Sequence, residues 1–343
     1  MVAHAIRTKS NRRGPRPFEP ARDLAAVARL LEEAFRPEHT FPLSNTPILR
    51  ELGIILWTLS YAPVFPENVT GYVWVEDGRV VGNTTISRDE SRLDRYLISN
   101  VAVKPSYRRQ GIARALMQVV IEHLRGRGAK WLLLNVRPSN ADAVNLYRAL
   151  GFQEVEMRGE WTASPPSPSL PLPPLLNRSS GSGEGEGGWG VRGEVRALRF
   201  SDRAAVTELI RAATPSNVHQ FRSPRLAEFD PQWEDLFGEL VSDFIVGQVT
   251  HRRVLEREGR LAAVMLVRGQ RWLSPHRIAI QVHPDYRGRA ENDLVAFALS
   301  DLARFPRREI RAAGASTHPE LIAALEQHGF KFLNGLMLMA LGL

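Results

Sequence analysis

The chain has 343 residues, of which 43% are hydrophobic, and a formal net charge of +8. This length and composition suffice for two ordinary hydrophobic cores, and no apolar run approaches the length of a membrane span. The absence of cysteine excludes disulfides, thiol nucleophiles and cysteine-based metal sites. Because the basic N-terminus has no apolar segment behind it, we expect no secretory signal and a soluble, cytoplasmic protein.

The positive charge does not by itself identify a partner. Only four of the 45 cationic residues are lysines, and the arginines are scattered among acidic residues without interleaved aromatic side chains. This pattern is not typical of a nucleic-acid surface. The basic cluster in residues 7–16 is the best nucleic-acid candidate, and a solvated tail explains it more simply. We predict neither a nucleic-acid nor a membrane partner, and the oligomeric state stays open.

Residues 1–14 are predicted to be a basic tail, and residues 15–162 a first domain. A short strand at 16–19 precedes a helix that Asp23 caps. Residues 48–61 form an unusually apolar helix, with more buried positions than one face would need. A hairpin then turns at Asp77-Gly78, a pair favoured in two-residue turns.

The chain is organised around residues 101–113, where a β-branched strand passes through a turn into an amphipathic helix. Gly111 and Ala113 leave the backbone of the connecting loop uncovered, and the first helical turn has amides without internal acceptors. Such amides at the positive end of a helix dipole form an anion site. Arg108, Arg109 and Arg114 add positive charge. The stretch therefore predicts a site for a pyrophosphate.

Two motifs resemble those of the GNAT superfamily of acyl-CoA-dependent N-acyltransferases. The first, Arg/Gln-x-x-Gly-x-Gly/Ala, is filled by Arg108, Gly111 and Ala113. The second, Asn-x-x-Ala-x-x-Leu-Tyr-x-x-x-Gly-Phe, is met by Asn140, Ala143, Leu146, Tyr147, Gly151 and Phe152. The resemblance implies an α/β (α+β) fold in which a mixed, mostly antiparallel twisted sheet is flanked by helices.

The resemblance also implies acetyl-CoA as co-substrate, and the histidine spacing gives no metal site. Tyr147 is expected to protonate the departing coenzyme sulfur, because a phenol with a pKa of about 10 stays protonated at neutral pH. The alternative is that Tyr147 only packs between helix and sheet. Asn140 either contacts the coenzyme or caps its helix. The expected coenzyme-binding residues are Val101, Ala102, Val103, Arg108, Arg109, Gln110, Gly111, Ile112, Ala113, Arg114, Asn140 and Tyr147.

A general base is harder to place. The ribosomal-protein N-terminal acetyltransferases carry Glu-Val-Arg-x-Ser-Asn where this chain has Asn-Val-Arg-Pro-Ser-Asn, beginning at Asn135. An amide cannot accept the proton, although it could position a water. Glu90 and Asp94 are spare candidates, and both also fit solvated loop charges. An acceptor amine of low pKa would need no dedicated base.

Residues 163–192 are predicted to be a linker, since their Pro-, Gly- and Ser-rich composition cannot form a packed core. The linker begins before the expected fold of the first domain is complete. The GNAT fold requires a hairpin after Phe152, but only one clear strand, residues 153–161, fits before the linker. We expect the missing strand to come from elsewhere in the chain, with the C-terminal run 336–341 as the candidate.

The second half repeats the first, so the chain resembles a tandem GNAT protein. Residues 280–292 align with 101–113, and residues 318–330 with 140–152. In this copy Ala290 and Asn292 replace the small residues of the first loop, with Glu291 between them, and Leu325 replaces Tyr147. A carboxylate there would repel a pyrophosphate. Residues 193–343 are therefore predicted to be a degenerate GNAT-like domain that shapes the acceptor site or serves as a scaffold.

The sequence thus predicts an N-acetyltransferase that moves an acetyl group directly from acetyl-CoA to a primary amine of a small molecule or protein. By resemblance, the helix at 48–61 lines the acceptor pocket, and its Trp57 and Tyr61 favour a small or partly apolar amine. A core or dimer helix is the alternative for that segment. The mycothiol synthases share the tandem arrangement, but their C-terminal copy is the active one, so their substrate is not carried over. The competing function is a non-catalytic acyl-CoA sensor or scaffold.

Overall fold

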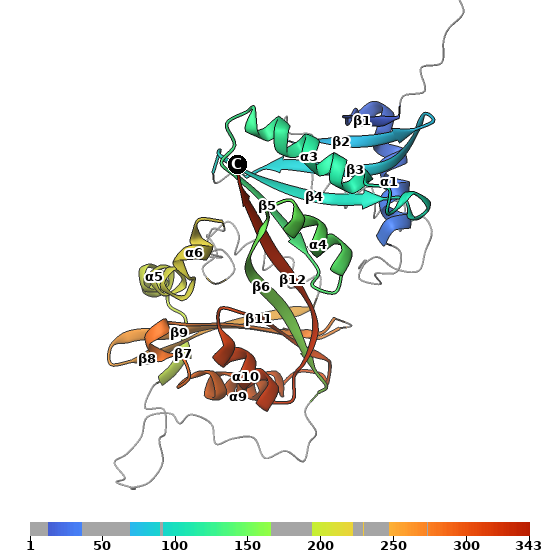
Figure 1. The fold of residues 1–343 in the computed structure, drawn as a ribbon. Coiled ribbons are helices and arrows are strands. Elements are labelled where there is room, and N and C mark those ends of the chain that lie inside the picture. The colour runs from blue at the N-terminus through green and yellow to red at the C-terminus, as the bar shows by residue number, and fades with distance from the viewer. Residues whose placement is uncertain are drawn as a thin grey trace, which may run out of the picture. The chain divides into compact units, whose positions relative to one another are not determined.

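The computed structural model describes residues 13–35, 69–89, 92–165, 194–221, 229, 247–272 and 274–343. The predicted tail up to residue 12, the helix at 48–61, Glu90 and most of the linker lie outside the described residues. The chain divides into two compact units (Figure 1). Unit 1 comprises Met1–Glu154 with Leu338–Leu343, and unit 2 comprises Val155–Met337.

Unit 1 is built on a sheet in the order β1-β2-β3-β4-β5-β12. Among its first five strands, neighbours pair antiparallel except β4 and β5, which are parallel. The β2–β3 hairpin turns at Asp77-Gly78 as predicted, with positive φ at both residues. The helices and strands of unit 1 are β1 (Gly14–Pro17), α1 (Pro20–Phe35), β2 (Val69–Glu76), β3 (Arg79–Arg88), β4 (Arg95–Val103), the single turn η1 (Pro105–Tyr107), α3 (Ile112–Arg125), β5 (Trp131–Val136) and α4 (Ala141–Ala149).

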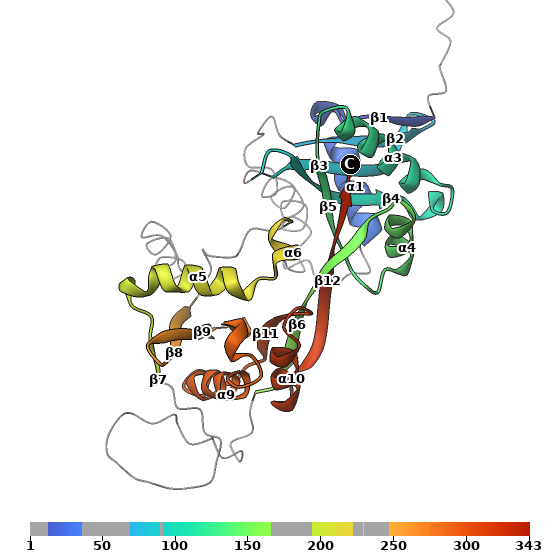
Figure 2. The ribbon, with the colours of Figure 1, turned by 60° about the vertical axis from the view of Figure 1, so that its left-hand side comes forward.

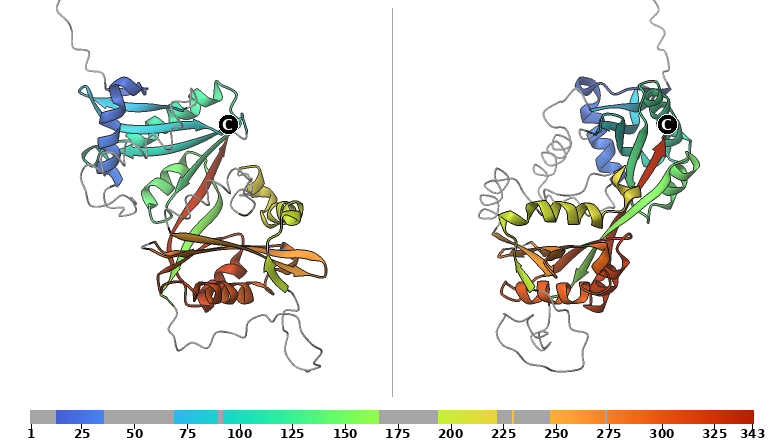
Figure 3. Two further views of the ribbon diagram at one scale, coloured as in Figure 1. Left: turned by 180° about the vertical axis from the view of Figure 1, so that it is seen from behind. Right: turned by 90° about the vertical axis from the view of Figure 1, so that its left-hand side faces the viewer.

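The sheet of unit 1 carries a helix on each face, because side chains alternate along a strand. Val73 and Val75 of β2 pack with Leu30 and Leu31 of α1 in one cluster. Tyr72 and Trp74, the alternate residues of β2, pack in a second cluster with Ile112 and Leu116 of α3. Figure 1 shows α3 in front of β2 and β3, and the reverse view in Figure 3 shows α1 on the other face.

Unit 2 repeats this arrangement. Its sheet has the order β6-β11-β10-β9-β8-β7, with α5 on one face and α9 on the other (Figure 2). The elements are β6 (Gln153–Ala163), β7 (Glu194–Ala197), η2 (Phe200–Asp202), α5 (Arg203–Ala213), α6 (Ser216–His219), β8 (Gln248–Arg257), β9 (Arg260–Gln270), β10 (His276–Val282), η3 (Pro284–Tyr286), α9 (Glu291–Leu302), β11 (Ile310–Ala315), α10 (Pro319–Gln327) and β12 (Lys331–Gly342).

The same ion-pair clamp opens both copies. In unit 1 the Arg16 guanidinium donates to both oxygens of Asp23 at 2.6 Å, which ties β1 to α1. In unit 2 Arg196 makes the equivalent pair with Asp202 at 2.7 and 3.0 Å. Each carboxylate also accepts a backbone N–H at the start of its helix. The internal repeat found in the sequence is therefore a repeat in three dimensions.

The two copies do not keep all of their own strands. β6 is one strand that ends at Ala163, and no second strand follows it before Pro165. From Val155 onwards β6 belongs to unit 2, where Arg158–Ala163 pair antiparallel with β11. Leu338–Leu343, at the other end of the sequence, belong to unit 1 beside β5, and the Leu343 amide donates to the Lys130 carbonyl at 3.0 Å. The prediction that the C-terminal run supplies the missing strand is confirmed.

None of the helices in the described part of the chain is both long enough and apolar enough to cross a membrane.

Candidate functional site

The centre of the site in unit 1 is a bulge in β4. Asn83 of β3 faces Ala102, whereas Thr85 faces Ser99, so Asn100 and Val101 together stand opposite one residue, Thr84. Asn100 has a φ of +53°, a left-handed conformation that asparagine adopts more readily than other non-glycine residues but that lies outside the range of a regular strand. A bulge of this kind bends the strand and breaks the regular hydrogen-bond ladder. The bulge includes Val101, and it adjoins Ala102 and Val103; all three are among the expected coenzyme-binding residues.

The loop after β4 leads to an open helix N-terminus. Gly111 is the N-cap of α3 with a φ of +79°, and Arg109 has a φ of +63°. The first turn of α3 has neither a side-chain cap nor an acidic residue. A Cβ built on Gly111 would have no heavy atom within 4 Å, so the space over the loop is open. The start of α3 therefore has uncapped amides at the positive end of a helix, the feature on which the expected anion site depends.

The three arginines of this loop differ in their contacts. Arg108 donates to the carbonyls of Val103 and Ala34, at 3.2 and 3.4 Å, and so ties the loop to the end of α1. Arg109 pairs with Asp142 at 2.9 Å, although its side chain is 82% exposed. Arg114 lies exposed on α3. Arg109 and Arg114 are thus exposed, whereas Arg108 holds the loop in place.

Tyr147 lies on the inner face of α4 and is only 6% exposed. Its ring packs against Phe152 with a centroid separation of 5.9 Å. Burial raises the pKa of Tyr147 to about 12, so the phenol keeps its proton. Asn140 caps α4, because its side-chain oxygen accepts from the Ala143 amide at 3.2 Å. The capping role proposed for Asn140 is therefore seen directly.

The structure does not bring Asp94 to the site. Asp94 precedes β4 at the end opposite the bulge, about 20 Å along the strand from Val101 at the usual rise per residue. Its carboxylate lies 3.8 Å from Lys130 and 3.9 Å from Arg92. Asn135 is exposed near the end of β5. Glu90 lies outside the described residues, and no group of histidine or acidic residues suited to a metal ion occurs among those described.

The second copy closes the corresponding helix start with its own carboxylate. Glu291, the first residue of α9, accepts from the Ala290 amide at 3.2 Å and pairs with His318 at 2.8 Å. Both side chains are almost fully buried. Burial by itself raises the pKa of Glu291, but the hydrogen bonds from His318 and from nearby backbone amides outweigh it and bring the pKa below its usual value. The carboxylate of Glu291 is therefore ionised at the start of α9.

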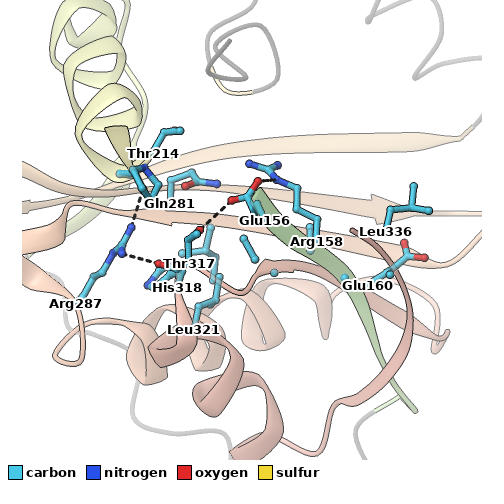
Figure 4. A pocket seen from close by; sticks show the side chains of 18 of the residues that line it. Glu156, Arg158, Glu160, Thr214, Gln281, Arg287, Thr317, His318, Leu321 and Leu336 are labelled. Atoms are coloured by element: carbon cyan, nitrogen blue, oxygen red, sulfur yellow. Dashed lines mark hydrogen bonds and ion pairs between the residues drawn. The ribbon is translucent and has the colours of Figure 1, made fainter. Parts of the chain in front are cut away.

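A cavity of ≈ 220 Å³ lies wholly within unit 2, along the ends of β10 and β11 and beside β6 (Figure 4). Glu156 is buried on its wall, where it accepts from Thr317 at 2.9 Å and from Arg158 at 2.8 Å. Arg287, the counterpart of Arg108, donates to the carbonyls of Ala213 and Thr317. The cleft of the second copy is therefore present, but its charged groups already have partners within the protein.

Sequence reasoning missed Asn83. This side chain is 2% exposed, and its Nδ2 donates to the Asn100 carbonyl at 3.0 Å. The signal was an asparagine inside the buried run of β3, where a residue with a polar amide has to find a partner. Without the pairing register, nothing in the sequence could say that this partner is the bulge.

Comparison with known proteins agrees with this geometry. The family model described as "Acetyltransferase (GNAT) family" matches residues 25–152. An N-alpha-acetyltransferase of Sulfurisphaera tokodaii is 30% identical over 134 residues, which cover 32% of this chain and 80% of that protein. The chain belongs to the GNAT acetyltransferase family.

Two further relatives mark the extent of the likeness. The [ribosomal protein bS18]-alanine N-acetyltransferase of Escherichia coli is 48% identical over 66 residues, 19% of this chain, and the chain spans 45% of the length of that relative. The crystal structure of a GCN5-related N-acetyltransferase from Sphaerobacter thermophilus matches with a TM-score of 0.59 and 17% identity, over 96% of this chain and 95% of its own. The latter likeness concerns the fold alone.

Proposed function

We propose that unit 1 is an N-acetyltransferase that moves an acetyl group directly from acetyl-CoA to a primary amine. The observation that carries the proposal is the combination, within one unit, of a bulged β4, an uncapped α3 N-terminus and the buried tyrosine of the second motif on α4. These are the parts that acyl transfer requires: a binding site for the anion, a polarised carbonyl and a proton donor.

Each part has an assigned task in the proposal. The amides that follow Gly111, with Arg109 and Arg114, hold the pyrophosphate. Main-chain groups of β4 from Asn100 to Val103 hold the pantetheine arm and the thioester carbonyl. Acetyl-CoA supplies the activated acetyl group. Tyr147 donates a proton to the departing sulfur, a task for which its raised pKa suits it, since the donor stays protonated.

The acceptor is proposed as an amine of a protein or of a small molecule. The curated relatives support a protein amine, since the names of two of them describe ribosomal-protein alanine and N-alpha acetylation. Against a ribosomal-type substrate stands Asn135, which cannot serve as base. Because no residue of unit 1 is assigned as the base, we expect the acceptor amine to be largely neutral at the working pH.

Unit 2 is proposed to be a copy that does not bind the coenzyme. The ionised Glu291 brings to the start of α9 a negative charge that would repel a phosphate, and Leu325 stands in place of Tyr147. The proposal gives unit 2 a scaffolding role that includes the strand exchanged with unit 1.

The test is calorimetric titration of acetyl-CoA into the full chain. We expect one site in the wild type, and affinity lowered at least about 100-fold by Gly111→Glu, which combines a repelling charge with backbone strain. Gly111→Asn is the control for strain, since asparagine tolerates the left-handed conformation. Arg289→Glu, at the exposed loop of unit 2, should leave binding unchanged.

Other outcomes would contradict the proposal. Two equal sites would mean that unit 2 binds the coenzyme. One site with no turnover on any amine, and no effect of Tyr147→Phe, would favour the sensor or scaffold. No binding at all would leave a GNAT fold without its chemistry.

A further inference from the structure

The bulge in β4 is a conformation that must be held in place. Its first residue, Asn100, has a left-handed φ of +53° without being glycine. Asparagine tolerates this conformation better than other non-glycine residues, but the conformation departs from the extended backbone of a regular strand, so the bulge needs support from its surroundings. The interrupted ladder also deprives the Asn100 carbonyl of its regular partner from β3.

One buried side chain supplies the missing contact. Asn83 Nδ2 donates to the Asn100 carbonyl at 3.0 Å, and the same nitrogen lies 3.4 Å from Thr85 Oγ1. Asn100 Nδ2 donates to that hydroxyl too, also at 3.4 Å. Asn83 is 2% exposed, so water does not compete for its amide. Asn83, Thr85 and Asn100 thus form a small network around the extra residue.

The second copy provides an internal comparison. Its strands β9 and β10 pair without a shift through Val264 and Gln281, the counterparts of Asn83 and Ala102. Val264 is fully buried in the apolar cluster under α5. Ala279 faces Leu266 as Ser99 faces Thr85, so Ile280 alone stands where Asn100 and Val101 stand in unit 1. Where the asparagine is replaced by valine, therefore, the strand is regular. The copy that has Asn83 has the bulge, and the copy that has Val264 in its place does not.

We infer that Asn83 is a positioning residue: it fixes the β4 bulge and thereby the main-chain groups that face the acyl donor. It acts through Asn100 and not by touching the substrate. The catalytic consequence rests on the proposed function of unit 1, whereas the structural consequence does not.

The experiment compares the full chain with Asn83→Val, which installs the residue of the second copy, and with Asn83→Asp, which keeps the size but removes the donor. Hydrogen exchange at Asn100, Val101 and Ala102 should become about fivefold faster in both variants, the effect of losing one hydrogen bond. The kcat for acetyl transfer should fall by about 10- to 100-fold, because the reacting carbonyl is less well placed. Affinity for coenzyme A without the acetyl group should change less than about twofold.

Ser87→Ala is the matched control. Ser87 Oγ also lies within hydrogen-bond distance of a β4 carbonyl, that of Leu97 at 3.5 Å, but in the regular part of the pairing. It should leave both exchange at the bulge and kcat unchanged. Unchanged exchange in both Asn83 variants, or an equal kcat loss in Ser87→Ala, would overturn the inference. Faster exchange in a chain that transfers no acetyl group would uphold the positioning role and refute the proposed function instead.

Discussion

At the scale of single residues, the two copies differ through a few substitutions with large physical consequences. Gly111 leaves the start of α3 open, whereas Glu291 fills the corresponding start of α9 with a buried carboxylate. Tyr147 offers a protonated phenol where Leu325 offers none. Both helices keep their place in the fold, so the difference lies in what their termini and inner faces present.

Tyr147→Phe tests the proton donor. The substitution removes one hydroxyl and keeps the packing against Phe152, so kcat should fall by about 100-fold while acetyl-CoA affinity is retained. Tyr96→Phe, on β4, is the control and should have little effect on kcat. The measurement is steady-state kinetics together with calorimetric binding. A loss of binding equal to the loss of rate would point to packing as the role of Tyr147.

The raised pKa of Tyr147 adds a pH dependence. Because the folded-state pKa is about 12, the phenol remains the acid form well beyond the usual tyrosine pKa of about 10. We therefore expect kcat to show no decline caused by Tyr147 up to about pH 11. A descending limb near pH 10 that is absent in Tyr147→Phe would contradict this assignment.

At the scale of elements, each copy begins with a strand and a helix joined by an arginine–aspartate clamp. The hydrogen bonds from Arg16 hold the pKa of Asp23 below its usual value although burial opposes this. Arg196 has the same effect on the pKa of Asp202. The clamp is thus a structural feature that both copies share, and both arginines are engaged in ion pairs within the protein.

Asp23→Ala and Asp202→Ala test the clamp. Asp23→Ala leaves the largely buried Arg16 without its carboxylate, which should cost about 3 kcal/mol of unfolding free energy at pH 7. Asp202→Ala should cost less, because Arg196 keeps its ion pair with Glu256 at 2.8 Å. A carboxylate with a lowered folded-state pKa stabilises the fold above its unfolded pKa of about 4, and the contribution is lost as the pH falls through the folded-state value. The difference between wild type and variant in urea denaturation should therefore shrink below pH 4.

The control for this prediction is the exposed pair Arg148–Glu154, where Glu154→Ala should cost less than about 0.5 kcal/mol. A clamp variant that is no less stable than this control at pH 7 would show that the buried pair does not stabilise the unit.

At the scale of the whole molecule, the exchange of segments makes each half of the sequence depend on the other. β6 completes the sheet of unit 2 beside β11, and Leu338–Leu343 complete that of unit 1 beside β5. We predict that a protease cut introduced within residues 166–193 leaves one particle in size-exclusion chromatography, with acetyl-CoA binding intact. Separation of the halves without denaturant would contradict the exchange.

Much of this organisation was readable from local patterns. The Asp77-Gly78 turn and the repeat depend on short stretches of chain, and they were predicted correctly. The early linker even indicated that a strand had to be borrowed. The bulge could not be predicted, since it depends on how Asn83 and Asn100 meet across two strands. The partners of Glu291 and the contacts of Arg108 likewise depend on residues far apart in the sequence.

The borrowed strand has a consequence for synthesis in the cell. When β5 has left the ribosome, the strand that lies beside it is still about 10–40 s from being made, at 5–20 residues per second. During that interval the edge of β5 presents unpaired backbone groups, a template for pairing with other chains. Unit 1 is therefore completed only once β12 has been made, and products that stop before β12 should be prone to aggregation and depend on chaperones.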